Sequence, residues 1–420
     1  MSSPQPIPSG AITGLLSQGV GESGIGHVLR VIRKHLRMDV AFISRFREVD
    51  RVFEHVDAEG VAPIEAGQTM PLEDGYCMKV VRGELPECIP DTSLVPAALA
   101  IPATRDLPIG AHLSIPVRLE RGEIYGTLCC FSHAPDTTLG QRDMSMLRAF
   151  ADVLAARIDE GLSLERFRES ARAEIRAAMA QGIPRMVYQP IYGLASDTLV
   201  GVECLARFDI EPRCAPDIWF NAARQAGVGL ELELFAIVSA LRALDAFPNS
   251  VFLGVNTSPE LVLSGKLAPV LERVDLSRIV IEITEHATVN DYAELCRALA
   301  PLRERGARLA IDDAGAGYAS MRHILDLKSD IIKLDMSLTH DIDADPSRRA
   351  LAKGLISFAH EIETQITAEG VETRAELDML RRLGADKVQG YYLSKPLSLD
   401  DALAEVQHGA PPSIRAAAMA

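Results

Sequence analysis

No long hydrophobic run is present in this sequence of 420 residues. A helix that spans a bilayer needs roughly 18 to 20 consecutive apolar residues, and no stretch reaches that length. The N-terminal segment MSSPQPIPSGAITG has neither a basic region nor a continuous apolar core, so it does not resemble a secretory signal. We therefore expect a cytoplasmic protein that has no membrane partner.

Cysteines are few and follow no regular spacing. The sequence has seven, of which Cys129 and Cys130 are adjacent, and no two form a CxxC pair. This pattern argues against a disulfide framework and against a structural zinc site.

Basic residues are outnumbered. The 43 Lys and Arg residues face 58 Asp and Glu residues, which gives a formal net charge of −15. Non-specific attraction to a nucleic-acid backbone is therefore not expected. A small phosphorylated ligand is not excluded, because a bound metal ion can reverse the sign of the field inside one cleft.

The chain is longer than one hydrophobic core usually organises, so we expect two domains. Residues 1–24 are rich in Gly, Ser and Pro and are expected to be flexible. Residues 25–160 combine the helical pattern GIGHVLRVIRKHLRM with the β-type runs VAFISRF, HLSIPVRL and IYGTLCCFS, which predicts an α+β domain. A long helical pattern begins at Leu139, and we interpret residues 161–182 as a helical linker.

Residues 183–410 alternate between short apolar runs and amphipathic helical stretches. The runs are MVYQPIYGL, LVGVECLARF, VFLGVNTS, IVIEITE, ARLAIDDAG, DIIKLD, QITAEGVE and KVQGYYLS. Eight strands separated mainly by helices predict a (β/α)8 barrel of the TIM type rather than an open sheet. Only the short turn ASDT joins the first two runs, so one strand is expected to be antiparallel to the rest.

Polar residues fall late in these runs or just after them, and in a barrel such strand ends meet on the catalytic face. Several carboxylates around one mouth repel each other unless a positive group lies among them. Mg²⁺ or Mn²⁺ suits this set, because these ions prefer oxygen ligands and need no His or Cys. The set consists of Glu203, Asn256, Glu282, Asp312, Asp313, Lys333 and Glu369.

Single members of this set have simpler interpretations. Asn256, before Thr257 and Ser258, also fits a plain helix cap, and Lys333 alone could be an ion-pair partner at the surface. The joint placement favours a two-metal site, in which adjacent aspartates hold ions and a lysine orients the attacking water or neutralises charge.

Residues 187–400 resemble the EAL domain, a cyclic di-GMP phosphodiesterase module. The motifs YQPI, ECLAR, VNTS, EITE, DDAGAGY, KLD, AEGVET and QGYYLSKPL occur in the order of that family. The resemblance implies metal ligands at Glu203, Asn256, Glu282, Asp312, Asp313 and Glu369, and catalytic roles for Lys333 and Glu369. It implies substrate contacts at Gln189, Arg207 and Gln389, with Arg207 on a phosphate, and loop-stabilising roles for Glu285 and Glu372.

The expected reaction is hydrolysis of cyclic di-GMP to linear pGpG with Mg²⁺ or Mn²⁺, inhibited by Ca²⁺ because of its looser and longer coordination. A homodimer is expected. The alternative is a catalytically silent receptor or scaffold that binds cyclic di-GMP, but no metal ligand and no lysine is missing. Two residues depart from the family pattern: Cys204 in the signature, which we expect to point away from the metals, and Ala314 in the loop after the paired aspartates.

The first 150 or so residues resemble a GAF sensor domain. The resemblance rests on the succession of helix, strand and hairpin, and on the closing segment IYGTLCCFSHAPDTTLGQRDMSMLRAFADVLAARI. This implies a small-molecule signal whose identity, and whose sign of control over the barrel, the sequence does not reveal. Cys77 could be an attachment site for a chromophore, but a core or pocket-lining cysteine is the favoured interpretation.

Overall fold

The structure is a computed structural model that describes residues 24–211, 213–284, 289–314 and 318–408. Contacts within the chain define two compact units, one ending at Phe167 (the N-terminal unit) and one beginning at Arg168 (the barrel unit). Helix α6 (Gln141–Ala180) contributes residues to both. The described residues include no helix that is both long enough and apolar enough to cross a bilayer.

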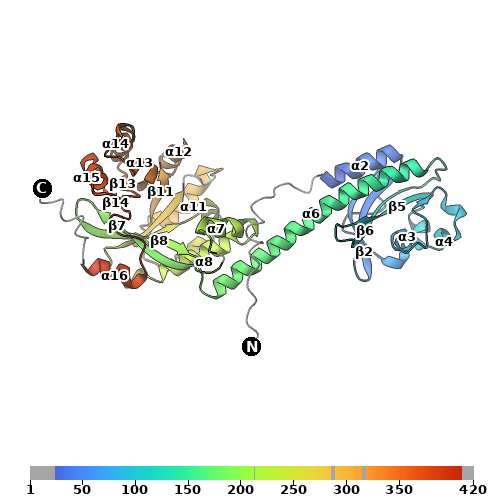
Figure 1. Cartoon of the computed structure of the whole chain (residues 1–420), viewed down its shortest axis with the longest axis horizontal. Coiled ribbons are helices and arrows are strands. Elements are labelled where there is room, and N and C mark those ends of the chain that lie inside the picture. The colour runs from blue at the N-terminus through green and yellow to red at the C-terminus, as the bar shows by residue number, and fades with distance from the viewer. Residues whose placement is uncertain (1–23, 212, 285–288, 315–317, 409–420) are drawn as a thin grey trace, which may run out of the picture. The chain divides into compact units, whose positions relative to one another are not determined.

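A six-stranded antiparallel sheet forms the centre of the N-terminal unit, and Figure 1 labels β2, β5 and β6 in it. The strand order is β3-β2-β1-β6-β5-β4. The predicted hairpin is present as β5 and β6. The strands are β1 (Val40–Phe46), β2 (Asp50–Ala58), β3 (Thr69–Pro71), β4 (Cys88–Ile89), β5 (Ala111–Arg118) and β6 (Ile124–Ser132). The helices besides α6 are α2 (Gly24–Leu36), α3 (Tyr76–Val81), α4 (Pro96–Leu99) and α5 (Pro102–Asp106).

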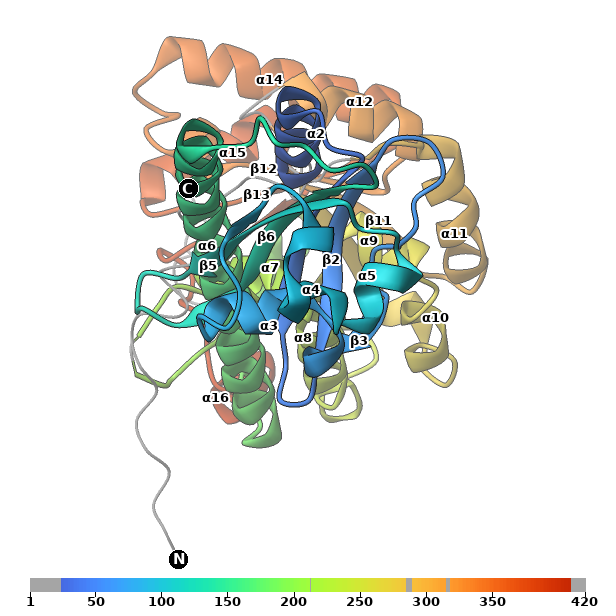
Figure 2. The ribbon, with the colours of Figure 1, turned by 90° about the vertical axis from the view of Figure 1, so that its right-hand side faces the viewer.

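Each face of this sheet carries its own apolar layer. Helices α2 and α6 cover one face, and the short helices α3 to α5 cover the other, as Figure 2 shows. Neighbouring residues of β1 divide between the layers, since Ile43 packs with α2 and α6 whereas Phe42 packs with the short helices. Because strand side chains alternate between faces, a strand buried on both faces is apolar at successive positions.

A closed eight-stranded barrel forms the second unit, with strand order β10-β11-β12-β13-β14-β7-β8-β9. The strands are β7 (Arg185–Gly193), β8 (Thr198–Arg207), β9 (Phe252–Asn256), β10 (Ile279–Thr284), β11 (Arg308–Ala314), β12 (Ile331–Leu334), β13 (Gln365–Ala368) and β14 (Lys387–Val388). The helices are α7 (Pro216–Gln225), α8 (Gly229–Leu241), α9 (Pro259–Leu263), α10 (Leu267–Val270), α11 (Tyr292–Glu304), α12 (Tyr318–Leu327), α13 (Met336–Thr339), α14 (Pro346–Glu361), α15 (Arg374–Leu383) and α16 (Leu399–His408).

The barrel confirms the predicted fold class, including the reversed strand. β7 pairs antiparallel with both β8 and β14, and the other neighbours pair in parallel. A parallel connection requires a crossover of a dozen or more residues, whereas the turn between Gly193 and Thr198 is short enough only for a hairpin.

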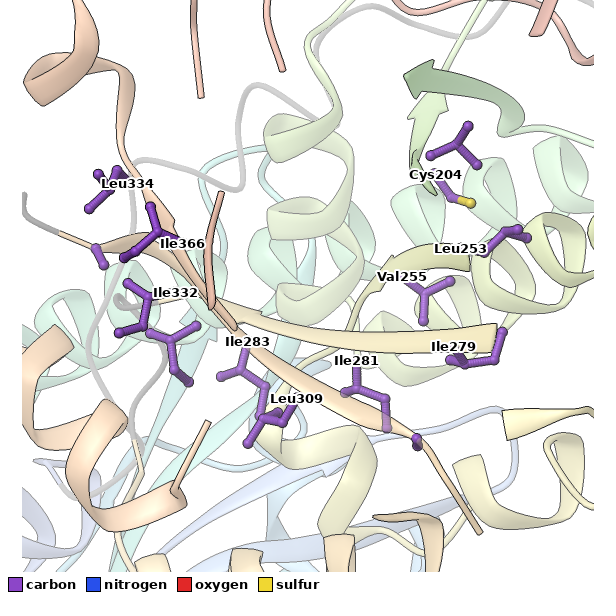
Figure 3. Close-up of a cluster of buried hydrophobic side chains, with 14 of the residues drawn as sticks. Cys204, Leu253, Val255, Ile279, Ile281, Ile283, Leu309, Ile332, Leu334 and Ile366 are labelled. Atoms are coloured by element: carbon purple, nitrogen blue, oxygen red, sulfur yellow. The ribbon is translucent and has the colours of Figure 1, made fainter. Parts of the chain in front are cut away.

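Alternation along the strands separates two apolar layers of the barrel. Ile281 and Ile283 face outward into the cluster between strands and helices, part of which Figure 3 shows. Val280 faces inward and packs in the barrel interior with Phe252 and Ile331. Cys204 belongs to the outer cluster, as expected from its place next to Glu203.

Candidate active site

Charged side chains replace apolar ones at the carboxyl end of the barrel interior. Val280 and Ile331 lie in the inner apolar layer, and two positions later the same strands carry Glu282 and Lys333. Because residues two apart share a face, these groups lie one pleat closer to the carboxyl end of the barrel. Gly254 makes room for one of them, because a Cβ at this glycine would lie 2.0 Å from Oε1 of Glu282.

Lys333 is the centre of the resulting cluster and is only 2% exposed. Four carboxylates lie within ion-pair distance of its Nζ atom. The distances are 2.7 Å to Glu282 Oε2, 2.8 Å to Glu369 Oε1, 3.0 Å to Asp312 Oδ1 and 3.5 Å to Glu203 Oε2. One ammonium group cannot neutralise four carboxylates, so protons or bound cations must balance the remaining charge.

Two amides connect the carboxylates. Gln389, which follows β14, donates from Nε2 to Glu203 Oε2 at 2.6 Å and to Glu369 Oε1 at 3.1 Å. Asn256, the last residue of β9, donates to Glu203 Oε1 at 3.4 Å. Ser258, not Asn256, caps helix α9 by accepting from the N–H of Leu261, so the plain helix-cap interpretation of Asn256 is wrong.

The pKa directions follow from burial and from this crowding. Burial raises the pKa of Glu282 to about 8, and the charges of Glu203 and Asp312 add to the rise against the effect of Lys333. Burial and the neighbouring carboxylates also raise the pKa of Glu369. Burial lowers the pKa of Lys333, but the surrounding carboxylates outweigh it and hold this pKa well above its ordinary value.

The donor set fits divalent cations. One oxygen each from Glu203, Glu282 and Asp312 lies within 4.8 Å of the others, and the same holds for Asp312, Asp313 and Glu369. Asp312 is common to both groups. The Oε1 atom of Gln389 is buried and accepts no hydrogen bond, which leaves an additional oxygen without a partner beside the carboxylates. Oxygen-rich, net-negative clusters of this kind suit Mg²⁺ or Mn²⁺.

The paired aspartates interrupt the regular strand. The register of β11 against β12 shifts between Ile311 and Ala314, and Asp313 adopts a left-handed backbone with φ of 58°. Its N–H donates to Oδ1 of Asp312 at 3.0 Å. Aspartate tolerates this region better than most residues, and the irregularity allows both carboxylates to lie at the mouth instead of on opposite faces.

A cavity of about 700 Å³ lies next to the cluster, between β8, β9 and helices α7 and α8. Asn256 lines it, as do Arg207, which is half-buried and donates to the carbonyl of Ala206, and Thr284. Its volume falls within the range of small-molecule sites. Gln189 is buried and pairs in register with Glu203 across β7 and β8, which places it beside the same cluster.

No contact of the described residues joins either predicted loop-stabilising glutamate, Glu285 or Glu372, to the cluster around Lys333. Glu285 lies outside the described residues, and Glu372 is exposed. Another glutamate, Glu376, orders the segment after β13. Its carboxylate is 1% exposed and accepts from the N–H groups of Asp341, Glu372 and Thr373 at 2.8 to 2.9 Å. The Thr373-x-x-Glu376 capping box was the sequence signal for it.

Replacing Glu376 with alanine is expected to lower the free energy of unfolding of the barrel by about 2–4 kcal/mol, because three backbone donors lose a charged acceptor. Urea denaturation followed by circular dichroism measures the change. Glu361→Ala, at an exposed position on α14, is the matched control. An equal loss in both variants would contradict this role.

Comparisons with known proteins agree with this geometry. The family model of the EAL domain matches residues 172–396, and that of the GAF domain matches residues 25–158. A probable cyclic di-GMP phosphodiesterase of Escherichia coli, PdeG, is 31% identical over 251 residues, which cover 56% of this chain and 49% of that protein. The cyclic di-GMP phosphodiesterase NbdA of Pseudomonas aeruginosa is 29% identical over 257 residues, 58% of this chain and 33% of that protein.

Solved structures support the fold. The phosphodiesterase PaMucR in complex with c-di-GMP superposes with a TM-score of 0.50 at 24% identity. The match covers 55% of this chain and 99% of the PaMucR chain. The EAL enzyme Bd1971 covers 88% of this chain and 93% of its own, with a TM-score of 0.54 at 18% identity. The present chain spans about half or less of the length of the two curated relatives named above. It belongs to the EAL domain family and carries a GAF domain before the barrel.

Proposed function

We propose that the barrel unit is a metal-dependent phosphodiesterase that hydrolyses cyclic di-GMP to linear pGpG. The observation that supports this most is the complete cluster of Lys333, four carboxylates and two amides at the carboxyl end of the barrel. The names of the relatives point to the same substrate. A receptor without catalysis would not need to maintain this many buried carboxylates beside each other.

Each group has a proposed role. Glu203, Asn256, Glu282, Asp312, Asp313 and Glu369 would hold Mg²⁺ or Mn²⁺, which when bound lower the pKa of water and stabilise charge on the phosphoryl group. Lys333 orients the attacking water or neutralises charge on the transferring group, and Glu369, 2.8 Å from its Nζ atom, assists it. Gln389 and Gln189 hold the substrate at the mouth.

Incubation of the purified protein with cyclic di-GMP, followed by chromatography of the nucleotides, tests the proposal. Mg²⁺ and Mn²⁺ are expected to support formation of pGpG, whereas Ca²⁺ is expected to inhibit it, because Ca²⁺ prefers longer and more numerous oxygen contacts. Undiminished turnover in Ca²⁺ alone would argue against the metal assignment. Binding of intact cyclic di-GMP without product in any metal would favour a receptor.

Arg207 is proposed to bind a substrate phosphate, since this residue lines the same cavity as Asn256. Arg207→Ala is expected to raise KM for cyclic di-GMP about 10- to 100-fold with a smaller effect on kcat. The proposed hydrogen bond between the guanidinium and the phosphate stabilises the bound substrate and the transition state about equally, so its loss weakens substrate binding. Arg242→Ala, at an exposed helix end, is the control and should leave both constants unchanged. A fall in kcat with unchanged KM would exclude the binding role.

The domain arrangement enters the proposal as well. We assign residues 25–160 to a sensor, 161–182 to a helical linker and 183–410 to the phosphodiesterase barrel, and we propose that the protein acts as a homodimer regulated by the sensor. The mass in solution and the turnover of the full-length protein, compared with a protein beginning near Gly182, test regulation and oligomeric state together.

A further inference from the structure

Two cysteines lie side by side in the interior of the N-terminal unit. Cys77, near the start of α3, and Cys129, on β6, are 52 positions apart in the sequence, and both belong to the apolar layer that the short helices cover. They are free thiols, 1% and 0% exposed, and their Sγ atoms are 3.5 Å apart. A disulfide bond is about 2.05 Å long, so an approach of about 1.5 Å would join the helix to the sheet.

Hydroxyl groups surround the two sulfur atoms. Oγ of Ser114 lies 3.2 Å from Sγ of Cys129, and the thiol of Cys129 reaches Oγ1 of Thr127 at 3.2 Å. On the other side of the pair, Oγ of Ser44 lies 3.7 Å from Sγ of Cys77 and 3.0 Å from Oγ1 of Thr127. A hydroxyl that donates a hydrogen bond to sulfur stabilises the thiolate relative to the thiol. The surroundings therefore favour ionisation of one sulfur of the pair.

A buried arginine adds positive charge beside Cys77. Arg51, on β2, is 3% exposed, and its Nε and Nη1 atoms have no hydrogen-bond partner. It lines the same internal cavity as Cys77, and the residues that line this cavity include no Asp or Glu. A buried charge without a counter-ion is strongly unfavourable, and a thiolate at Cys77 would supply one.

The two thiols have different pKa shifts. Burial raises the pKa of Cys77, but the hydrogen bond with Cys129, the charge of Arg51 and the nearby hydroxyls outweigh it and lower this pKa to about 5. Burial and the contact with Cys77 raise the pKa of Cys129 well above its usual range. The thiolate is the nucleophilic form of cysteine, so Cys77 is the group that attacks an oxidant and Cys129 is the neutral thiol beside it.

We propose that Cys77 and Cys129 are an oxidative modification site, at which hydrogen peroxide converts the two thiols into a reversible disulfide. The Cys77 thiolate attacks one oxygen of the peroxide, the O–O bond breaks and hydroxide leaves, which gives a sulfenic acid on Cys77. The sulfur of Cys129 then attacks the sulfur of Cys77, and the proton of Cys129 leaves with the hydroxyl of the sulfenic acid as water. The dithiol loses two electrons and the peroxide gains them.

The position of Cys77 on a short helix connects this chemistry to the fold. Helix α3 has only six residues, and short elements of this kind open locally at a lower free energy than the core of a sheet, which gives the oxidant access. Strands β4 and β5 and helices α4 and α5 lie between the two cysteines in the sequence. The disulfide would therefore close a loop that contains most of this layer and restrict its opening. The inference concerns the N-terminal unit alone and does not depend on the reaction of the barrel.

The competing explanation is that both cysteines are inert core residues. Cys130, the next residue of β6, shows what such a thiol looks like. It is 0% exposed and packs in the opposite layer, under α2 and α6, where burial raises its pKa to about 12. Because Cys129 and Cys130 are adjacent but face different layers, they form a matched pair for the test.

Peptide mass spectrometry of the full-length protein distinguishes the two explanations. The reduced protein is treated with hydrogen peroxide until its thiol content is constant, denatured in N-ethylmaleimide to block the remaining thiols, and digested with trypsin. The tryptic peptide 52–79 contains Cys77 as its single cysteine, and the peptide 122–142 contains Cys129 and Cys130. We expect these two peptides to be linked in most of the chains, and dithiothreitol to separate them.

Cys129→Ser is expected to abolish the link, and Cys130→Ser is expected to preserve it. Arg51→Met should slow formation of the link about tenfold at neutral pH, because a smaller fraction of Cys77 is then a thiolate. Arg82→Met, which removes a half-exposed arginine at the end of α3, should leave the rate unchanged.

Three outcomes would overturn the disulfide. They are a wild-type protein that forms no link, also in urea below its unfolding transition, a link that persists in Cys129→Ser, and loss of the link in Cys130→Ser. An unchanged rate in Arg51→Met would overturn the assignment of Cys77 as the thiolate held by this arginine. If Arg51→Met does not fold, the wild-type protein and the two serine variants decide the question.

Discussion

Lys333→Ala is expected to reduce the turnover of cyclic di-GMP about a hundred- to a thousandfold while leaving substrate binding nearly intact. The ammonium group is the positive centre of the cluster, and removing one pre-positioned group of this kind typically has such an effect on the chemical step. Measurement of kcat at saturating substrate, together with the Kd for cyclic di-GMP, separates the two effects. Lys353→Ala, at an exposed position on α14, serves as control.

The same variant has an expected effect on stability. Without the ammonium, four carboxylates face one another, and breaking a buried ion pair by removing one partner costs about 3–5 kcal/mol. The Tm of metal-free Lys333→Ala is therefore expected to fall, and Mn²⁺ is expected to restore much of it. A near-wild-type rate would exclude the catalytic role, and an unchanged Tm without metal would show that the carboxylates are neutralised by protons.

Asp312→Asn is expected to lower turnover on the order of a thousandfold, because Asp312 is the carboxylate shared by both groups of candidate metal ligands. The amide keeps the shape of the side chain but loses its charge, so calorimetric titration should also show weaker binding of Mn²⁺. Asp326→Asn, at an exposed position on α12, is the control. Unchanged Mn²⁺ affinity together with unchanged turnover would remove Asp312 from the metal site.

Much of the barrel could be predicted from the sequence, because its strands appear as short apolar runs and the side chains of each strand alternate between the two faces. Each strand is a short apolar run, and the polar residue at its carboxyl end occupies the inner face by alternation, as with Val280 and Glu282. The short turn after Gly193 likewise predicted the reversal of β7. Both features depend only on residues that are neighbours in the sequence, so the sequence pattern is sufficient to predict them.

Contacts between residues far apart in the sequence could not be predicted from such local patterns. Gln389 lies 186 residues from Glu203, and only the closed barrel shows that its amide joins Glu203 to Glu369. Glu233 was also overlooked, although it accepts from both the N–H and the hydroxyl of Ser258. Arg51 gave no signal, because its burial depends on helices that follow it in the chain.

The direction of β7 has a mechanical consequence. In an all-parallel barrel, the chain before the first strand enters at the end opposite the chemistry. Here β7 runs the other way, so its first residue, Arg185, pairs in register with Arg207 at the catalytic end, and Gly193 lies at the far end. The nine residues of β7 span roughly 30 Å. Force applied to the chain just before Arg185 therefore acts on the rim beside the proposed phosphate-binding arginine and does not have to pass through the barrel wall.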